Sequence, residues 1–244
     1  MIFIYGDELQ WKTHRITFSP PLTARTKPLI LAFMLAENTI QPLQPEDVKL
    51  IQEIDQLWEP VYPFLANHIQ EVYGRRDGVI LEIGPFCGVI LALMAQGVGS
   101  KFIIGAFPKG IELFFHNYIK TKGLAGEISV AETDQSFTNM QDNSIDLVIF
   151  RGALFFPSLF QVDYQAVSRV MKSGGIAMIG GGFGKLTPPE IIHPIADRSK
   201  ELNLKIGKIE VTAEQVKEDI EASGALIDHQ IVHEGGLWVI LNKG

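Results

Sequence analysis

The sequence predicts an α/β protein built around a mostly parallel sheet. From Gly78 onward, short apolar stretches alternate with helical patterns. Strands that alternate with helices form right-handed βαβ units, in which the strands lie parallel. The chain ends with two strand patterns on either side of Gly235-Gly236, a spacing typical of a hairpin. We therefore expect an antiparallel pair of strands at one edge of the sheet.

The elements are expected in the following order. Strand patterns cover residues 79–84, 101–107, 127–133, 144–150, 176–180, 226–234 and 237–243. Residues 144–150 are nearly all apolar, as in a strand that is covered on both faces. Helical patterns cover residues 89–97, 111–122, 164–171 and 213–223. Thr212 is a good N-cap for the last of these helices, and Gly224 ends it.

Residues 1–75 form an N-terminal extension in this prediction. Residues 1–18 match a hairpin that turns at Gly6-Asp7, and Pro20-Pro21 interrupts regular structure after it. Apolar residues recur at helical spacing between residues 46 and 73, and Pro60 and Pro63 divide this pattern into two helices. We expect the helices to form a lid over the carboxyl edge of the sheet, with plain core packing as the alternative. The hairpin is a candidate contact in a homodimer.

Composition excludes several classes of function. The 244 residues carry 21 basic and 28 acidic side chains, a net charge of −7, and no basic block that would indicate nucleic-acid binding. A single cysteine excludes an internal disulfide. No apolar run reaches the roughly 20 residues of a membrane span, and the first residues lack a signal-peptide pattern. The histidines show no metal-ligand spacing. We expect a cytoplasmic protein that binds no metal, membrane or nucleic acid.

The first strand of the predicted sheet ends in LEIGPFCG (81–88). Gly84 and Gly88 let the backbone pass close to a ligand, and the helix that follows points free N–H groups at it. Ligands of open α/β sheets bind beyond the carboxyl ends of the strands, where this turn lies. Two glycines in such a turn are equally compatible with a purely structural role.

The order of motifs resembles the Rossmann-like (class I) S-adenosylmethionine-dependent methyltransferases of the small-molecule type, over about residues 57–244. LEIGPFCG looks like the first motif of that family, acid-x-Gly-x-Gly-x-Gly. Further motifs of the family are matched by VAETDQS (130–136), DNSIDLVIFRGAL (142–154) and VSRVMKSGG (167–175). The resemblance implies a methyltransferase-like domain at 76–244. Its seven strands have the order 3-2-1-4-5-7-6, with strand 7 antiparallel, and its cofactor is S-adenosyl-L-methionine.

The resemblance also implies where the cofactor binds. It lies over the first-motif turn, and Asp134 at the end of the third strand faces the adenine amino group. The implied cofactor-binding residues are Glu82, Gly84, Pro85, Phe86, Cys87, Gly88, Phe107, Pro108, Asp134, Gln135, Arg151 and Gly152.

Two positions depart from the family pattern. Phe86 replaces the middle glycine, and Phe107 replaces the acid that binds both ribose hydroxyls. Burying those hydroxyls without partners costs roughly 1–3 kcal/mol each. A protein of this fold with lost or altered cofactor binding, in a binding or scaffold role, is therefore an alternative. Lys109 suggests a third class of function, an oxidoreductase that binds a phosphate-bearing nucleotide.

An aromatic loop, FRGALFFPSLF (150–160), follows the fourth strand and predicts a small aromatic or hydrophobic acceptor. Core packing is the alternative for each phenylalanine. The charge of Arg151 within this run needs a partner, for which Asp146, Asp134 and a ligand carboxylate are candidates. The candidate acceptor-binding residues are Trp58, Tyr62, Phe155, Phe156, Phe183 and His193.

No catalytic base is assigned, because His116 and His193 are isolated on predicted helices. Cys87 lies near a helix N-terminus, which would lower the pKa of its thiol, but the family commonly has small residues at this position, so packing is the preferred interpretation. Residues 180–185, GGGFGK, form either a flexible exit from the fifth strand or a loop that binds a ligand.

Overall fold

The seven strands of the sheet have the predicted order. The computed structural model describes residues 42–244, so the hairpin expected over residues 1–18, its dimer contact and the break at Pro20-Pro21 lie outside the described residues. The sheet order is β3-β2-β1-β4-β5-β7-β6, and β7 runs antiparallel to both of its neighbours. The strands are β1 (Val79–Ile83), β2 (Lys101–Ala106), β3 (Ile128–Glu132), β4 (Ile145–Arg151), β5 (Met171–Gly181), β6 (Asp228–Val232) and β7 (Leu237–Asn242).

One strand begins earlier than predicted. The expected fifth strand starts at Ile176, after a turn at Ser173-Gly174-Gly175, whereas β5 already starts at Met171, which pairs with Ile145. The pairing then shifts register, and Leu147 pairs with Ile176. The turn residues are thus contained in an irregular stretch of the strand, where Gly174 has a φ of 72°. Pairing with β4, which is a tertiary contact, extends the strand beyond its local pattern.

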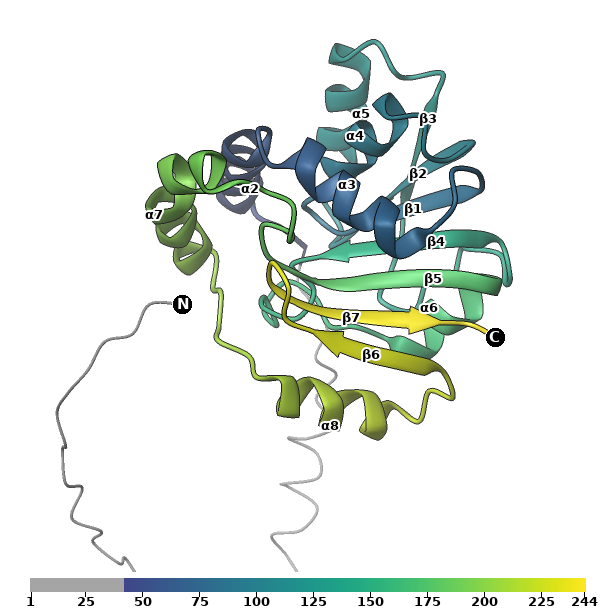
Figure 1. Ribbon diagram of the computed structural model, residues 1–244. Coiled ribbons are helices and arrows are strands. Elements are labelled where there is room, and N and C mark those ends of the chain that lie inside the picture. The colour runs from purple at the N-terminus through teal and green to yellow at the C-terminus, as the bar shows by residue number, and fades with distance from the viewer. Residues whose placement is uncertain (1–41) are drawn as a thin grey trace, which may run out of the picture. The chain divides into compact units, whose positions relative to one another are not determined.

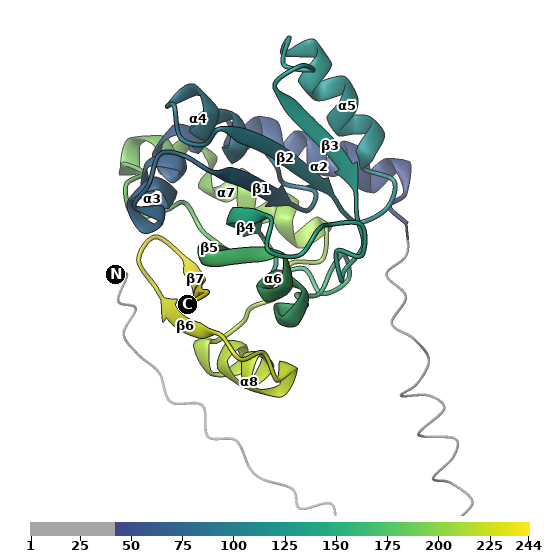
Figure 2. The same cartoon turned by 90° about the vertical axis from the view of Figure 1, so that its right-hand side faces the viewer.

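Helices cover both faces of the sheet (Figures 1 and 2). On one face α3 (Tyr62–Tyr73) packs against α4 (Val89–Ala95), and α5 (Glu112–Thr121) packs against β2 and β3. On the other face α6 (Tyr164–Val170) packs against β5 and α8 (Ala213–Ser223). The N-cap prediction for α8 is confirmed, since the Thr212 hydroxyl accepts a hydrogen bond from the Gln215 amide.

Two helices lie beyond the carboxyl ends of the parallel strands. They are α2 (Pro45–Trp58) and α7 (Pro189–Lys205), which contact each other (Figures 1 and 2). The predicted division at Pro60 and Pro63 is confirmed, because α2 ends at Trp58 and α3 starts at Tyr62. The two expected lid helices therefore separate: α2 lies over the carboxyl edge, and α3 lies on a face of the sheet.

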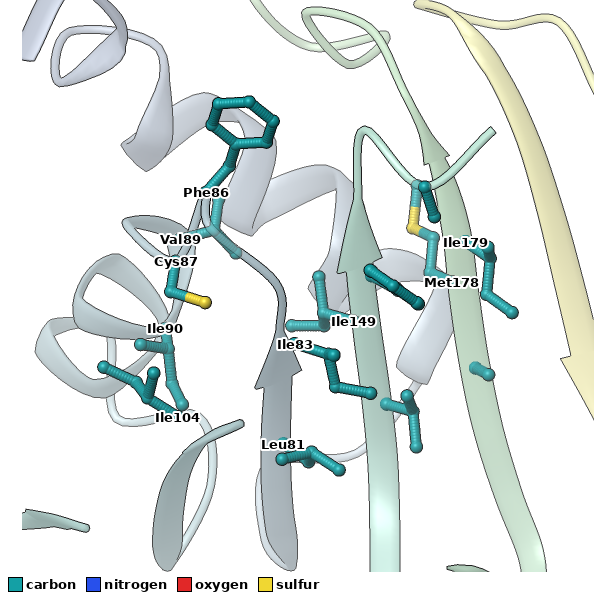
Figure 3. Close-up of a cluster of buried hydrophobic side chains, with 14 of the residues drawn as sticks. Leu81, Ile83, Phe86, Cys87, Val89, Ile90, Ile104, Ile149, Met178 and Ile179 are labelled. Atoms are coloured by element: carbon teal, nitrogen blue, oxygen red, sulfur yellow. The ribbon is translucent and has the colours of Figure 1, made fainter. Parts of the chain in front are cut away.

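The core lies between the central strands and the helices. Side chains of β1, β4 and β5 such as Leu81, Ile149 and Met178 are fully buried (Figure 3). Burying a side chain of this size contributes roughly 1.5–3 kcal/mol, so the core fixes the strand ends that carry the site. Within residues 42–244, no helix has the length and apolarity needed to cross a membrane.

Candidate functional site

A pocket of about 280 Å³ lies beyond the carboxyl ends of β4 and β5, and residues of α2 and α7 form part of its lining. We call it the aromatic pocket. Its aromatic side chains are Trp58, Phe86, Phe155, Phe156 and Phe183. The indole of Trp58 stacks on the Phe183 ring, with 4.7 Å between centroids and 7° between planes. The rings of Phe86 and Phe156 also touch, at 5.3 Å. These five aromatic residues come from four separate segments of the chain.

Of the six predicted acceptor-binding residues, four line the pocket and two do not. Trp58, Phe155, Phe156 and Phe183 line it. His193 is exposed on α7 and is absent from the lining. Tyr62 is buried beside the pocket, where its hydroxyl donates a short hydrogen bond to the Asp55 carboxylate. Its ring fills the space in front of Gly88, because a Cβ added to Gly88 would lie 2.0 Å from that ring.

Three of the predicted cofactor-binding residues, Phe86, Arg151 and Gly152, also line the aromatic pocket. Phe86 projects beyond the end of β1, as Figure 3 shows, and reaches Gly152, where an added Cβ would lie 3.1 Å from the Phe86 ring. The first-motif turn and the loop after β4 therefore meet at one wall of the pocket. This contact uses the phenyl ring that replaces the family's middle glycine.

Buried hydrogen bonds stabilise the first-motif turn. Gly84 has a φ of 104°, which favours glycine, and its amide donates to the Gly105 carbonyl at 3.0 Å. Glu82 lies below the turn, fully buried, and its Oε2 accepts a hydrogen bond from the Ile90 amide at 2.7 Å. Its Oε1 has no hydrogen-bond partner among the described residues. Burial raises the pKa of Glu82 to about 8, although Arg151 acts in the opposite direction.

Cys87 belongs to the same turn and is fully buried. Its Sγ lies 3.1 Å from the Gly84 carbonyl oxygen. Burial raises the pKa of the Cys87 thiol well above its usual range. The lower pKa that a helix N-terminus would cause is therefore not found, and the preferred interpretation, packing, agrees with the burial of this residue. Loss of solvent outweighs the effect of the helix end at a site with no exposure.

Arg151 has none of the protein partners expected for it. Asp146 lies at the other end of β4 and binds the Val79 amide, Lys172 and Arg75. Asp134 accepts hydrogen bonds from the amide and hydroxyl of Thr138. Instead, the guanidinium of Arg151 lies over the rings of Tyr62 and Trp58, at 4.7 and 5.3 Å from their centroids.

The remaining predicted cofactor-binding residues lie along the carboxyl ends of β2 and β3. Phe107 and Pro108 are buried just after β2. Asp134 is exposed just after β3, and Gln135 beside it is half-buried. Partial burial acts to raise the pKa of Asp134, but the hydrogen bonds from Thr138 lower it overall. Lys109, the residue behind the phosphate-nucleotide alternative, is exposed and lies 4.0 Å from Glu132.

The loop after β5 forms part of the pocket wall. Gly181, Gly182 and Phe183 line the cavity. The loop is also anchored to the β6–β7 hairpin, because the Gly184 amide donates to the Gly235 carbonyl at 2.8 Å. Of the two interpretations, flexible strand exit and binding loop, this placement favours the second.

Several pocket residues were not anticipated from the sequence. Ser199, Lys200 and Asn203 reach the pocket from α7, and Lys208 and Glu210 from the segment after it. Only the position of α7 beyond the sheet edge brings them there, and no local pattern indicates that position. Asp55, buried on α2, did carry a signal. It lies four residues after Ile51, on the apolar face of the helix, where an ionisable group is unusual.

Comparison with known proteins identifies the fold. No protein-family model matches the sequence, and neither does any curated protein sequence. A structure from Methanococcus maripaludis, described as a candidate S-adenosyl-L-methionine-dependent methyltransferase, is 26% identical with a TM-score of 0.66, over 83% of this chain and 96% of the other. A SAM-dependent methyltransferase from Aquifex aeolicus is 16% identical with a TM-score of 0.55, over 82% and 97%.

A third similar structure is described as a cyclase and not as a methyltransferase. It is the [4+2]-cyclase SpnF, 18% identical with a TM-score of 0.50, over 71% of this chain and 62% of the other. The fold is therefore shared with a protein that is named for a reaction other than methyl transfer. The motifs, the strand order and these likenesses agree that the chain has the class I Rossmann-like fold of the S-adenosylmethionine-dependent methyltransferases.

Proposed function

We propose that this protein is an S-adenosyl-L-methionine-dependent methyltransferase whose acceptor is a small aromatic or hydrophobic molecule bound in the aromatic pocket. The observation that carries the proposal is the contact between Phe86 of the first-motif turn and Gly152 at the pocket wall. The likeness to the Methanococcus protein supports the cofactor. Because the turn and the pocket share this wall, a cofactor over the turn and an acceptor in the pocket would be neighbours.

The residues present fit the cofactor at two points. Gly84 offers a turn without a side chain, and Asp134 offers an exposed carboxylate at the end of β3 to the adenine amino group. The ribose position departs from the family, because Phe107 is buried there and has no acceptor atom in its side chain. When bound, S-adenosylmethionine supplies an electrophilic methyl group on a sulfonium.

The protein's contribution is to align the acceptor and exclude water. The stacked rings of Trp58 and Phe183 provide one flat apolar wall, and Phe155 and Phe156 add further aromatic lining. Flat apolar walls favour an aromatic acceptor over a charged polymer. A sulfonium is a good leaving group, so the reaction does not depend on a strong catalytic base.

Binding of the nucleoside product tests the proposal. We expect S-adenosylhomocysteine to bind the wild-type protein in calorimetry, and Asp134→Ala to weaken it about tenfold through the lost adenine contact. Glu127→Gln is the matched control, because Glu127 is an exposed acid just before β3, at the opposite end of that strand. Equal affinity in wild type and Asp134→Ala would contradict this placement of the adenine.

Acceptor choice provides the second test. A panel of phenols, thiols and amines is offered with S-adenosylmethionine, and methyl transfer is followed by mass spectrometry. Phe155→Ala should change the preference among acceptors, because its half-buried ring lines the pocket. Phe114→Ala, which removes a half-buried ring on α5, should leave the preference unchanged.

A second candidate function is a binding or scaffold protein that no longer uses the cofactor. Two observations favour it: Phe107 at the ribose position, and the bond from the Leu43 amide to the Lys109 carbonyl, 3.0 Å long, beside that position. The segment before α2 thus lies against the loop where the ribose would lie. Absence of S-adenosylhomocysteine binding at millimolar concentration would favour this candidate over the methyltransferase.

A further inference from the structure

Arg151 is a buried charge at the wall of the aromatic pocket. It is the last residue of β4, its exposed fraction is 5%, and it lines the cavity. Its Nη1 is buried without a hydrogen-bond partner, and no carboxylate of the described chain forms an ion pair with it. A buried N–H group without a partner is costly, so the free Nη1 indicates a missing acceptor.

The surroundings of Arg151 offset part of its charge but leave its Nη1 without an acceptor among the described residues. The guanidinium lies over the Tyr62 and Trp58 rings, and Tyr62 also stabilises its charge, but Nη1 has no hydrogen-bond partner among the described residues. The nearby acids are Asp55 and Glu82, and burial raises the pKa of both, that of Glu82 to about 8. Burial acts to lower the pKa of Arg151, but Tyr62, Glu82 and Asp55 raise it overall, so Arg151 keeps its charge at the pocket wall.

The rest of the pocket has the same electrostatic bias. Across the lining drawn from residues 42–244, Arg151, Lys200 and Lys208 are basic and Glu210 is the sole acid. Lys208 lies over the Phe155 ring, 5.3 Å from its centroid. The chain as a whole has a net charge of −7. A basic, aromatic cavity in an acidic protein is complementary to an aromatic anion.

We propose that the acceptor carries an anionic group, of the carboxylate type, and that Arg151 binds this group and determines specificity for it. That the bound molecule is the methyl acceptor rests on the proposed function, whereas the binding of an anion in the pocket does not depend on it. The aromatic body of the ligand lies between the ring walls, and its anion lies against the Nη1 of Arg151. A planar guanidinium binds a carboxylate through two parallel hydrogen bonds, which a lysine cannot do.

Two probe molecules that differ in charge test the proposal on the full chain. 2-Naphthoate and 2-naphthamide have the same aromatic body, and calorimetry measures the affinity of each without S-adenosylmethionine. We expect wild type to prefer the naphthoate by about tenfold or more, the value of one charge-assisted hydrogen bond. Equal affinities, or binding of neither probe, would overturn the proposal, and this measurement depends on no variant.

A variant then assigns the preference to Arg151. In Arg151→Gln the affinity for 2-naphthoate should fall to the level of 2-naphthamide. The affinity for 2-naphthamide should be the same in the variant as in wild type. Arg151→Lys keeps the positive charge but loses the two parallel N–H groups of the guanidinium, so its preference for 2-naphthoate over 2-naphthamide should be intermediate. Arg76→Gln is the control, since Arg76 is exposed and binds the Gln96 carbonyl away from the pocket. Retention of the full preference in Arg151→Gln would overturn the proposal.

The cofactor's own carboxylate is the rival source of an anion. 5′-Methylthioadenosine lacks the whole amino-acid end of S-adenosylhomocysteine, so comparing the two measures the contribution of that end, which carries the carboxylate. If Arg151→Gln weakens S-adenosylhomocysteine alone and leaves 2-naphthoate unchanged, Arg151 serves the cofactor and the proposal fails. If naphthoate binds as expected and S-adenosylhomocysteine does not bind at all, the anion site stands and methyl transfer fails.

Discussion

At the scale of single residues, the buried ionisable groups under the first-motif turn have consequences that can be measured. Glu82 illustrates them, with one oxygen on the Ile90 amide and the other without a partner among the described residues. Its pKa rises from the usual value of 4.5 to about 8 because it is buried. The folded state therefore retains a proton that the unfolded chain releases.

The stability of the wild-type protein should fall between pH 5 and pH 8 through Glu82. A raised pKa in the folded state stabilises that state at low pH, and the gain is lost as pH rises toward the folded pKa, by at most about 1.4 kcal/mol per pH unit. Glu82→Gln removes this contribution and should flatten the profile, measured as the free energy of unfolding in urea at each pH. Glu127→Gln, at an exposed acid, should retain the wild-type slope, and a wild-type slope in Glu82→Gln would refute the assignment.

Cys87 should be unreactive in the native protein. Its thiol is fully buried and its pKa is raised, so almost no thiolate is present at pH 8. A colorimetric disulfide reagent should label it only after denaturation. The chain has a single cysteine, so all the signal comes from this residue. Rapid labelling of the native protein would show that the turn opens to solvent.

At the scale of elements, the contact between α2 and α7 completes the aromatic pocket. The indole Nε1 of Trp58 on α2 donates to the Ser199 hydroxyl on α7 at 2.9 Å, and that hydroxyl also accepts from Asn203 at 3.2 Å. Because Ser199 is buried, this hydrogen bond is shielded from water and contributes to holding the indole in its stack with Phe183.

Ser199→Ala should loosen this contact. It leaves the indole N–H without its acceptor, at a cost of about 1–3 kcal/mol. Amides of α7 should exchange faster with deuterium, as measured by mass spectrometry. Ser223→Ala, which removes a half-buried hydroxyl at the end of α8, should leave exchange in α7 unchanged. Unchanged exchange of α7 in Ser199→Ala would mean that other contacts position the helix.

At the scale of the whole molecule, the C-terminal hairpin supports the pocket loop. A Cβ added to Gly182 would lie 2.2 Å from the Gly235 carbonyl oxygen, and Gly182 has a φ of 145°. Gly182→Ala should therefore separate the two loops and cost about 1–3 kcal/mol from overpacking, with further strain from the backbone.

The matched control is Gly126→Ala, because an added Cβ at Gly126 meets no atom within 4 Å. Urea unfolding measures the stability of both variants, and calorimetry with 2-naphthoate measures the pocket. We expect Gly182→Ala to lose both stability and binding, and Gly126→Ala to lose neither. A neutral Gly182→Ala would show that the hairpin does not hold the pocket wall.

The sequence was sufficient for the sheet but not for the site as a whole. Strand–helix alternation and the Gly235-Gly236 spacing are local patterns, and they predicted the parallel strands and the terminal hairpin correctly. The phenylalanines show what sequence alone does not predict, because Phe150 and Phe160 are buried in the core whereas Phe155 and Phe183 line the pocket. Composition does not distinguish these roles.

The environment of Arg151 shows the same limit more sharply. The sequence identified its charge as one in need of a partner, but its neighbours Tyr62 and Trp58 come from segments about ninety residues earlier. Their positions depend on where α2 and α3 pack, which is decided by tertiary contacts. The same is true of Ser199 and Lys208, which α7 and the segment after it bring to the pocket.

The order in which the pocket wall is synthesised has a consequence for biogenesis. The lining extends along the chain from Ile54 to Glu210, and the hairpin that supports it follows later still. A ribosome releases the first-motif turn long before the last wall residue, so the nascent chain exposes Trp58 and the aromatic loop to solvent or to chaperones. A ligand stabilises only the state that it binds. Pocket ligands should therefore rescue completed chains and give no protection during translation.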